Sequence, residues 1–395
     1  MDEQRVSPIT QDGNTGMKSS PERWNQYVLA SGNDLQTMLN AHFAERERNL
    51  VFILGKGFDP RMNLGAKAVL SAGGAGARAV VLLDFDEGPD SPSVSYEPRM
   101  KRNVSELEQL IGTRCKLSVN KVLMFSTERR RIVARSAAGL ITDLNTFKGT
   151  TDYVVDVSSL PRGIFYPLIA KLLHLIDQIP DTRQRPNLMI LVGESAALDG
   201  LITDDGIDED ADYLHPFRGG AEREATAALP KVWLPILGER QAVQLARIND
   251  LVRPDEICVV LPSPSINPRR GDDLILEYRQ LLYDELMVDP RNFVFASELN
   301  PFEAYKQLRR AIVHYNEALM PLGGCRSILT SVSSKLLSLS ALLAAYELKE
   351  AHFDISVAHI ECDGYKIQSE EAAIEAATQR TNLFGLWLTG EFYVS

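Results

Sequence analysis

The segment NLVFILGKGFDPRM, residues 49–62, contains the pattern that decides the fold: an apolar run that leads into a polar turn with two glycines. A continuous apolar run of this length is typical of a strand that is buried on both faces of a sheet. Runs of the same kind recur in the first half of the chain, at residues 78–86, 152–159 and 187–195. Most are followed by a loop and an amphipathic stretch such as residues 167–179. The pattern predicts repeated strand–helix units around a largely parallel sheet.

A second series of apolar runs follows in the other half of the chain, at residues 231–237, 256–265, 292–298, 326–334 and 354–362. Long helical patterns separate several of these runs, at residues 272–287, 300–319 and 335–351. Each series accounts for one sheet covered by helices. We therefore expect an α/β protein with two Rossmann-like, doubly wound domains whose sheets are mainly parallel.

Between the two series the apolar period is lost, and an acidic insertion is expected near residues 201–215. Glycines and a proline follow it, which places the boundary between the domains near residues 215–228. The expected N-terminal domain covers residues 26–220 and the C-terminal domain residues 228–395. The polar first 25 residues are expected to form a flexible tail.

Composition limits the classes of function. The 395 residues are 45% hydrophobic and carry a formal net charge of -11, so a broad basic face that coats nucleic acid is not expected. No run approaches the roughly 18 apolar residues of a membrane span, and the polar start lacks a signal core, which favours the cytoplasm. The four cysteines are far apart and the six histidines form no ligand motif, so neither a disulfide framework nor a metal site is expected.

The turn after residues 49–55 is a candidate anion site. It lacks the third glycine of a dinucleotide fingerprint, and Lys56 lies between the glycines rather than before a Ser or Thr, so it is not a Walker loop either. Gly57 and Asp59 could open a helix whose free amides favour an anion, with Arg61 as a second contact. Asp84, at the end of the next run, is placed like the ribose-binding acid of a Rossmann fold. The alternative is that Asp59 and Arg61 pair with each other.

Polar side chains also follow the run at residues 152–159. Asp156, Ser158, Ser159 and Arg162 lie just past the carboxyl end of a predicted strand, where open α/β sheets bind ligands. The pattern favours a polar lip of a binding site, and the alternative is a helix cap. No histidine lies nearby in the sequence, so a serine nucleophile is not favoured.

The strongest signal lies at residues 327–348, SILTSVSSKLLSLSALLAAYEL. Ser331, Ser333 and Ser334 offer hydroxyls and open amides where a predicted strand meets an apolar helix, and Lys335 adds a cation. This combination suits a phosphate. A proline-rich loop after another predicted strand could converge on the same pocket, with its polar candidates Ser263, Ser265, Asn267, Arg269 and Arg270.

The stretch ILTSVSSKLLSLSALLAAYEL resembles the strand, small polar turn, lysine and long apolar helix of CARF-type Rossmann domains, whose relatives include the paired SAVED sensors. In those domains the turn holds the phosphates of cyclic oligonucleotide second messengers made during prokaryotic antiviral defence. The resemblance implies Thr330, Ser331, Ser333, Ser334 and Lys335 as ligand contacts. Serines replace the glycines and threonines that are usual in the family, and the first half of the chain resembles a degenerate partner unit.

Residues 99–135 form the one candidate face for nucleic acid. Ten basic residues gather there against three acids, with Phe125 as a single aromatic residue, so contacts would go to the phosphate backbone. The equal alternative is that these cations pair with the acidic insertion or with a subunit interface.

Three functions remain open. The first is a nucleotide or cyclic-oligonucleotide sensor or adaptor of an antiphage defence system, with an effector subunit or a second copy as partner. The second is a hydrolase or glycosidase acting on nucleotides through Asp84, Asp156 or Glu194. The third is a structural subunit that docks on nucleic acid through residues 99–135.

Overall fold

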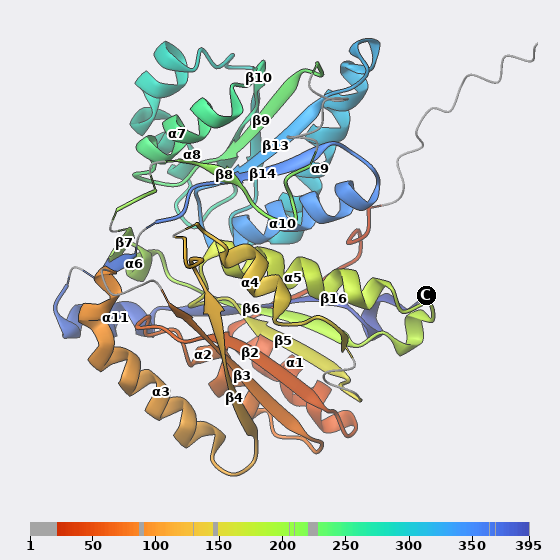
Figure 1. Ribbon diagram of the computed structural model, residues 1–395, viewed down its shortest axis with the longest axis vertical. Coiled ribbons are helices and arrows are strands. Elements are labelled where there is room, and N and C mark those ends of the chain that lie inside the picture. The colour runs from red at the N-terminus through yellow and green to blue at the C-terminus, as the bar shows by residue number, and fades with distance from the viewer. Residues whose placement is uncertain are drawn as a thin grey trace, which may run out of the picture.

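The structure is a computed structural model, and it describes residues 22–394 except 87–90, 129, 145–148, 205, 209, 220–227, 363 and 368. Two seven-stranded sheets lie one above the other, with helices between them and around them (Figure 1). Five neighbouring strands are parallel in each sheet. The α/β class with two Rossmann-like, mainly parallel sheets is therefore confirmed.

The first sheet has the order β1-β16-β6-β5-β2-β3-β4. Its strands are β1 (Val28–Ser31), β2 (Leu50–Gly55), β3 (Arg78–Asp86), β4 (Lys116–Leu123), β5 (Asp152–Asp156), β6 (Asn187–Glu194) and β16 (Asn382–Thr389). The strands from β6 to β4 are parallel, whereas β16 runs antiparallel to both β1 and β6. The helices of this unit are α1 (Gly32–Glu45), α2 (Leu64–Ser71), α3 (Glu97–Ile111), α4 (Val133–Gly139) and α5 (Arg162–Asp177).

Alternate residues of β2 face two different cores, as expected for a strand that is buried on both sides. Leu50, Phe52 and Leu54 belong to the core that contains residues of α1, α2 and α3. Val51 and Ile53 belong to a larger core, which contains residues of α4 and α5 and continues into the second unit. The helices thus cover both faces of the first sheet.

The second sheet has the order β12-β11-β9-β13-β14-β8, and β10 pairs with β9. Its strands are β8 (Asp212–Tyr213), β9 (Lys231–Ile236), β10 (Glu256–Ile257), β11 (Val259–Pro262), β12 (Phe293–Ala296), β13 (Arg326–Ser331) and β14 (Ile355–His359). Its helices are α7 (Ala242–Val252), α8 (Arg270–Glu277), α9 (Pro301–Ala318) and α10 (Lys335–Glu350), and Leu281–Glu285 form a π-helical turn.

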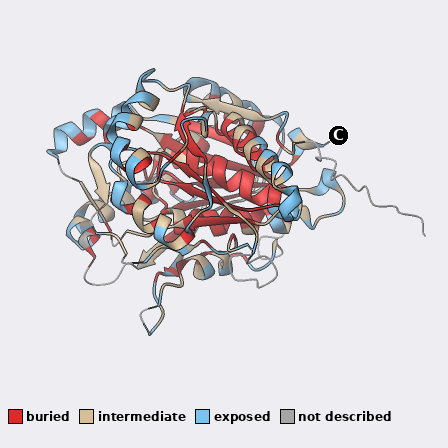
Figure 2. Ribbon diagram, turned by 90° about the horizontal axis from the view of Figure 1, so that it is seen from above, coloured by how far each residue is buried: buried red, intermediate tan, exposed pale blue. Residues whose placement is uncertain are grey.

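Helices α5 and α10 join the two units. Both are almost entirely buried and contribute to one continuous core, visible as the red centre of the molecule in Figure 2. Tyr166 of α5 donates a hydrogen bond to the backbone oxygen of Ser338 in α10 at 2.6 Å. A small sheet of β7 (Ile202–Asp204) and β15 (Tyr365–Ile367), with α6 (Ala196–Asp199) and α11 (Glu371–Gln379), lies beside this joint (Figure 1).

Three features correct the expected division of the chain. Strand β16 belongs to the first sheet, because it pairs with β6 and β1 although it follows the second series of strands. The expected acidic insertion, residues 201–215, contains β7 and β8, which pair with strands from the second half of the chain. Residues 1–21 of the expected tail lie outside the described residues, but Trp24 is 0% exposed and donates from Nε1 to the oxygen of Leu388 at 3.0 Å.

In the part of the chain that the structure describes, no helix combines the length and the apolar character needed to cross a membrane.

Candidate ligand site between the two sheets

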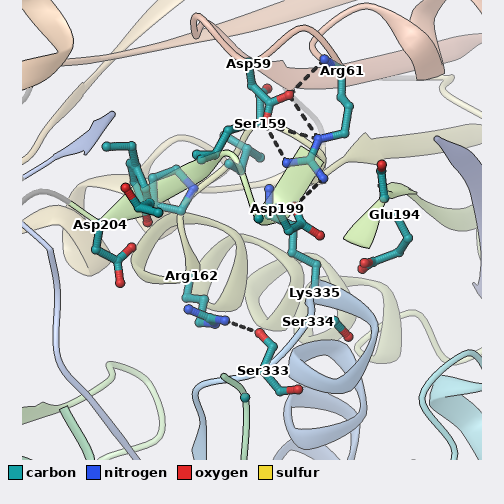
Figure 3. A pocket seen from close by; sticks show the side chains of 18 of the residues that line it. Asp59, Arg61, Ser159, Arg162, Glu194, Asp199, Asp204, Ser333, Ser334 and Lys335 are labelled. Atoms are coloured by element: carbon teal, nitrogen blue, oxygen red, sulfur yellow. Dashed lines mark hydrogen bonds and ion pairs between the residues drawn. The ribbon is translucent and has the colours of Figure 1, made fainter. Parts of the chain in front are cut away.

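The carboxyl ends of strands from both sheets open on one cavity of about 1490 Å³. Residues that follow β2, β3, β5 and β6 line it from the first unit, and residues that follow β9 and β13 line it from the second. In parallel α/β sheets, ligands bind beyond the carboxyl ends of the strands. The two edges therefore form one shared site, part of which is shown in Figure 3.

The turn after β2 forms the ion pair that the sequence left as an alternative. Arg61 is 4% exposed, and its guanidinium contacts the Asp59 carboxylate at 2.8 Å and Asp199 at 2.7 Å (Figure 3). The two carboxylates raise the pKa of Arg61 despite its burial, and Arg61 keeps the pKa of Asp59 below its usual value despite the burial of that carboxyl. Gly57 and Arg61 both line the cavity. The charge of Arg61 is already neutralised by the carboxylates of Asp59 and Asp199.

Asp84 also lines the cavity and forms an ion pair with Lys56 at 2.9 Å. Both side chains are about one-third exposed, so solvent screens the pair and a ligand hydroxyl could still reach it. The position expected for a ribose contact is therefore compatible with the cavity.

The turn after β5 divides the predicted residues into two groups. Asp156 is buried and accepts backbone hydrogen bonds from Ser158 at 2.9 Å and Gly65 at 3.1 Å, and burial raises its pKa to about 6. The hydroxyl of Ser158 accepts from the amide of Gly193 at 2.8 Å. Neither residue lines the cavity, so both are corrected from ligand contacts to internal supports of the turn.

Ser159 and Arg162 do line the cavity. The hydroxyl of Ser159 donates to the backbone oxygen of Gly55 at 2.9 Å. Helix α5 begins after Pro161, so neither Ser158 nor Ser159 caps that helix. Arg162 crosses to the other unit: its Nε donates to the hydroxyl of Ser338 at 3.0 Å, and Nη2 donates to the backbone oxygen of Ser333 (Figure 3).

The serine turn after β13 is only partly available to a ligand. The hydroxyl of Thr330 accepts from Trp233 Nε1 at 2.9 Å, and that of Ser331 lies 3.0 Å from the hydroxyl of Ser338. Both residues are buried and neither lines the cavity, so the contacts implied for them by the resemblance are corrected. Because both residues belong to β13, their side chains point to opposite faces of the second sheet, Thr330 toward Trp233 and Ser331 toward Ser338 of α10.

The rest of this turn faces the cavity. Ser334 caps α10 by accepting from the amide of Leu337 at 3.3 Å. The hydroxyl of Ser333, a residue that is 8% exposed, has no hydrogen-bond partner among the described residues. Lys335 donates to the backbone oxygen of Ser158 in the first unit, and burial together with Arg61 lowers its pKa to about 8.

Glu194, at the end of β6, reaches across the cavity to the same helix. Its Oε1 accepts from the amide of Leu336, in the first turn of α10, at 3.0 Å. Burial and the neighbouring Asp199 raise the pKa of Glu194 to about 7, against the opposing effect of Arg61 and Lys335. In this structure a carboxylate of the protein itself therefore accepts a hydrogen bond at the start of α10, where a phosphate was predicted.

The proline-rich loop reaches the cavity through only one of its predicted residues, Arg270. The hydroxyl of Ser265 donates to the oxygen of Asn267 at 2.8 Å, and Asn267 accepts from the amide of Arg269 at 3.0 Å. Like Ser263, these residues are absent from the cavity wall, because they close a turn of their own. Arg270, the second arginine predicted in this loop, does line the cavity, where it pairs with Glu239 at 2.8 Å and with Glu298.

Charges of the two signs are equally numerous on the cavity wall. The eight cations are Lys56, Arg61, Lys121, Arg162, Arg240, Arg270, Lys335 and Arg380. The eight anions are Asp59, Asp84, Glu194, Asp199, Asp204, Glu239, Glu277 and Glu298. A densely charged polyanion would therefore find no net positive field, whereas a ligand with few phosphates and other polar groups would suit the wall.

Buried polar atoms without a hydrogen-bond partner gather at this cavity. Within the described residues, five residues with such an atom line it: Ser93, Thr203, Gln244, Arg270 and Ser333. Buried polar atoms are normally satisfied, and each one that is not costs about 1–3 kcal/mol. Water or a polar ligand in the cavity would satisfy these atoms.

Sequence reasoning missed the contribution of β9 and α7 to this wall. Gly238 and Glu239 follow β9 directly, and Gln244 lies in the first turn of α7. A Cβ on Gly238 would lie 2.2 Å from the backbone oxygen of Val332, so this glycine allows the turns after β9 and β13 to approach closely. The available signal was a glycine immediately after an apolar run, at the end of LPILG.

The basic segment pairs largely with acids of the protein. Arg99 and Arg102 contact Glu371 of α11, and Arg131 contacts Asp208 of the acidic segment. The alternative of pairing with the acidic segment thus describes Arg131, whereas Arg99 and Arg102 pair within the protein with a different element. We find no observation that favours the nucleic-acid face over this pairing.

Among the described residues, one group of potential metal ligands comes together: His42, Glu45 and Glu391. Arg48 contacts both carboxylates at 2.8 Å, and His42 lies 2.7 Å from Asp152. The guanidinium supplies the positive charge there, so the group does not suggest a metal centre.

Comparisons with known proteins add no functional information. No family model matches the chain, and no curated protein is similar to it. Among solved structures, a functionally unknown protein from Pseudomonas aeruginosa PAO1 is 11% identical, with 88% of this chain and 98% of that chain covered and a TM-score of 0.21. A similarity this low carries no argument about function.

Proposed function

We propose that the protein binds a nucleotide-class ligand bearing one or two phosphates in the cavity between the sheets and acts as a sensor or adaptor. The observation that carries the proposal is the single cavity shared by the carboxyl ends of both sheets, where partnerless buried polar atoms collect. A ligand there contacts both units at once, so its binding free energy depends on how the units are arranged.

The size and chemistry of the wall support this class of ligand. Sites for drug-sized molecules usually measure about 300–1,000 Å³, so a cavity of about 1490 Å³ has room for a dinucleotide-sized molecule. Val243, which is 59% exposed, provides apolar surface for a base, and Phe58, a buried ring that packs at a tilt against Tyr96, lies on the same wall. The start of α10 and Lys335 provide amides and a cation for a phosphate.

The resemblance of the serine turn to CARF-type domains suggests the biological setting. On that basis the ligand is a nucleotide or a cyclic oligonucleotide signal of prokaryotic antiphage defence. A change in the contact between α5 and α10 would then be passed to an effector subunit or to a second copy of the chain.

Mass spectrometry of small molecules that copurify with the intact protein tests the class of ligand directly, and thermal denaturation with a panel of mono-, di- and cyclic nucleotides tests its binding. Lys335→Met should abolish ligand-induced stabilisation, because it removes the cation at the start of α10. Lys349→Met is the matched control, since Lys349 lies at the other end of α10 and donates to Pro216. Equal stabilisation of both variants, or no stabilisation of the wild type by any nucleotide, contradicts the proposal.

One observation favours a second candidate, a hydrolase or glycosidase acting on nucleotides. The carboxyl group of Glu194 lines the cavity, and its pKa near 7 suits a general acid. Of the two other predicted acids, Asp156 does not reach the cavity, whereas Asp84 lines it and pairs with Lys56. Turnover of a labelled nucleotide by the wild type, lost in Glu194→Gln, would support catalysis, and binding without turnover would support the sensor.

A further inference from the structure

The first turn of α10 is a candidate anion-binding site whose hydrogen-bond donors are only partly used. Helix α10 has 16 residues, and its first turn opens on the cavity. The Glu194 carboxylate accepts from one amide, that of Leu336, and the Ser334 hydroxyl accepts from that of Leu337. Within the described residues, the amides of Ser333 and Lys335 find no acceptor, and the Ser333 hydroxyl is also without a partner.

We propose that Glu194 is a built-in competitor of the ligand: in the empty protein its carboxylate contacts the start of α10, and the ligand's phosphate displaces it. This inference rests on the proposed function and adds its regulation. Binding of the phosphate and release of the contact between β6 and α10 then become one event.

The charges around Glu194 lower the free energy that is needed to displace its carboxylate. Asp199 of α6 repels its negative charge, while Arg61, from the turn after β2, and Lys335 of α10 attract it. Arg61 already has two carboxylate partners, Asp59 and Asp199, so its charge is largely committed. The result is a carboxyl group with a pKa near 7, which changes between its charged and neutral forms within the physiological range. The neutral form no longer competes for the amides.

The contact is placed where its loss affects both units. Lys335 donates to the Ser158 oxygen of the first unit, and Arg162 of the first unit donates to the Ser333 oxygen. With the Glu194 contact, these make three polar contacts between the start of α10 and the first unit, of which Figure 3 shows that of Arg162. A ligand that replaces the Glu194 contact therefore leaves only two of these three contacts, those of Lys335 and Arg162, between the start of α10 and the first unit.

Inorganic sulfate is a suitable probe, because its charge is constant near neutral pH and it lacks a base. We would titrate the ¹⁵N-labelled full chain with sulfate and follow the amides of residues 333–337, at about pH 6 and about pH 8. Wild-type affinity should rise as the pH falls, because protonated Glu194 does not compete. Glu194→Gln should bind about tenfold more tightly than wild type at the higher pH and should keep only the weaker pH dependence that comes from Lys335, whose pKa is lowered to about 8.

Asp204→Asn is the matched control. It removes one carboxylate from the same cavity wall, but Asp204 accepts from Gln244 at 2.7 Å and does not contact α10. Its sulfate affinity should exceed that of wild type by about twofold, and by the same factor at both pH values.

Equal sulfate affinity of wild type and Glu194→Gln, a wild-type affinity that does not change with pH, or no binding of sulfate at these amides overturns the inference. Because Lys335 titrates in both proteins, the difference between the pH profiles of wild type and variant decides the matter, and Glu194→Ala replaces Glu194→Gln if that variant does not fold. Nucleotide binding with unchanged affinity in Glu194→Gln would leave the proposed function standing and remove only this regulation. Sulfate binding that follows the expected pattern without binding of any nucleotide would do the opposite.

Discussion

At the scale of single residues, the chemistry is concentrated in Glu194, Lys335 and Arg61, which come from three separate segments. The sequence placed all three at the ends of predicted strands, where a parallel sheet binds ligands. It could not show the direction of each side chain. Asp156 lies at an equally favourable position, yet its carboxylate is used up by two backbone amides.

Glu194 should make stability depend on pH. Its pKa is near 7 in the folded protein and near 4.5 when unperturbed, so the folded state holds the proton more tightly. The stabilisation is fully present below the unfolded pKa and is lost as the pH rises through 7. Glu194→Gln lacks this titration, so its stability relative to wild type should increase by about 1 kcal/mol between about pH 5 and about pH 8, after allowance for partial exposure.

Urea denaturation at the two pH values measures this difference. Asp156, whose pKa is raised to about 6, titrates in both proteins and cancels in the comparison. A difference between variant and wild type that is constant over the range would show that Glu194 is ionised throughout.

At the scale of the elements, the apolar runs predicted β2, β3, β5 and β6 and five strands of the second sheet. The sequence missed β1, β4 and β16. Strand β4 is an edge strand whose exposed residues make its pattern polar, so it was assigned to the basic segment. The run NLFGLWLT of β16 is apolar, but its partner β6 ends nearly 190 residues earlier, a separation that no local pattern reveals.

Two helical glycines provide a test of how α2 is packed. A Cβ on Gly65 would lie 2.2 Å from Oδ2 of Asp156, so Gly65→Ala should destabilise the protein by about 1–3 kcal/mol and disturb the turn after β5. Gly139 of α4 has open space around it, and Gly139→Ala should stabilise the protein by about 0.5–1 kcal/mol. Chemical denaturation of both variants checks the pair, and equal effects would contradict the close packing of α2 on Asp156.

At the scale of the whole molecule, the two units share structure that the expected boundaries separated. Trp24 precedes the first strand, packs edge-on against Tyr305 of α9 with ring centroids 5.4 Å apart, and donates to Leu388 of β16. The sequence could not reveal this joint, because a lone tryptophan in a polar segment carries no periodic signal. Nor could the sequence predict that the two sheets are arranged around one cavity.

Because of this shared core, calorimetry should record one cooperative unfolding transition. Trp24→Ala should lower the stability of the whole molecule by about 3–5 kcal/mol, since it empties a fully buried site in the joint. Leu276→Ala, at a side chain that is 66% exposed, is the control and should change little. Two separate transitions, only one of them shifted by Trp24→Ala, would show that the units fold independently.

The position of β16 has a consequence for synthesis of the protein. In the first sheet β1 pairs with β16 alone, and β16 is the last of the named strands to leave the ribosome. A nascent chain therefore exposes the open side of β6 until residues 382–389 have been made, and unpaired strand edges invite aggregation. Premature termination before residue 382 would leave that edge open permanently, so truncated products should be targets for chaperones and proteases.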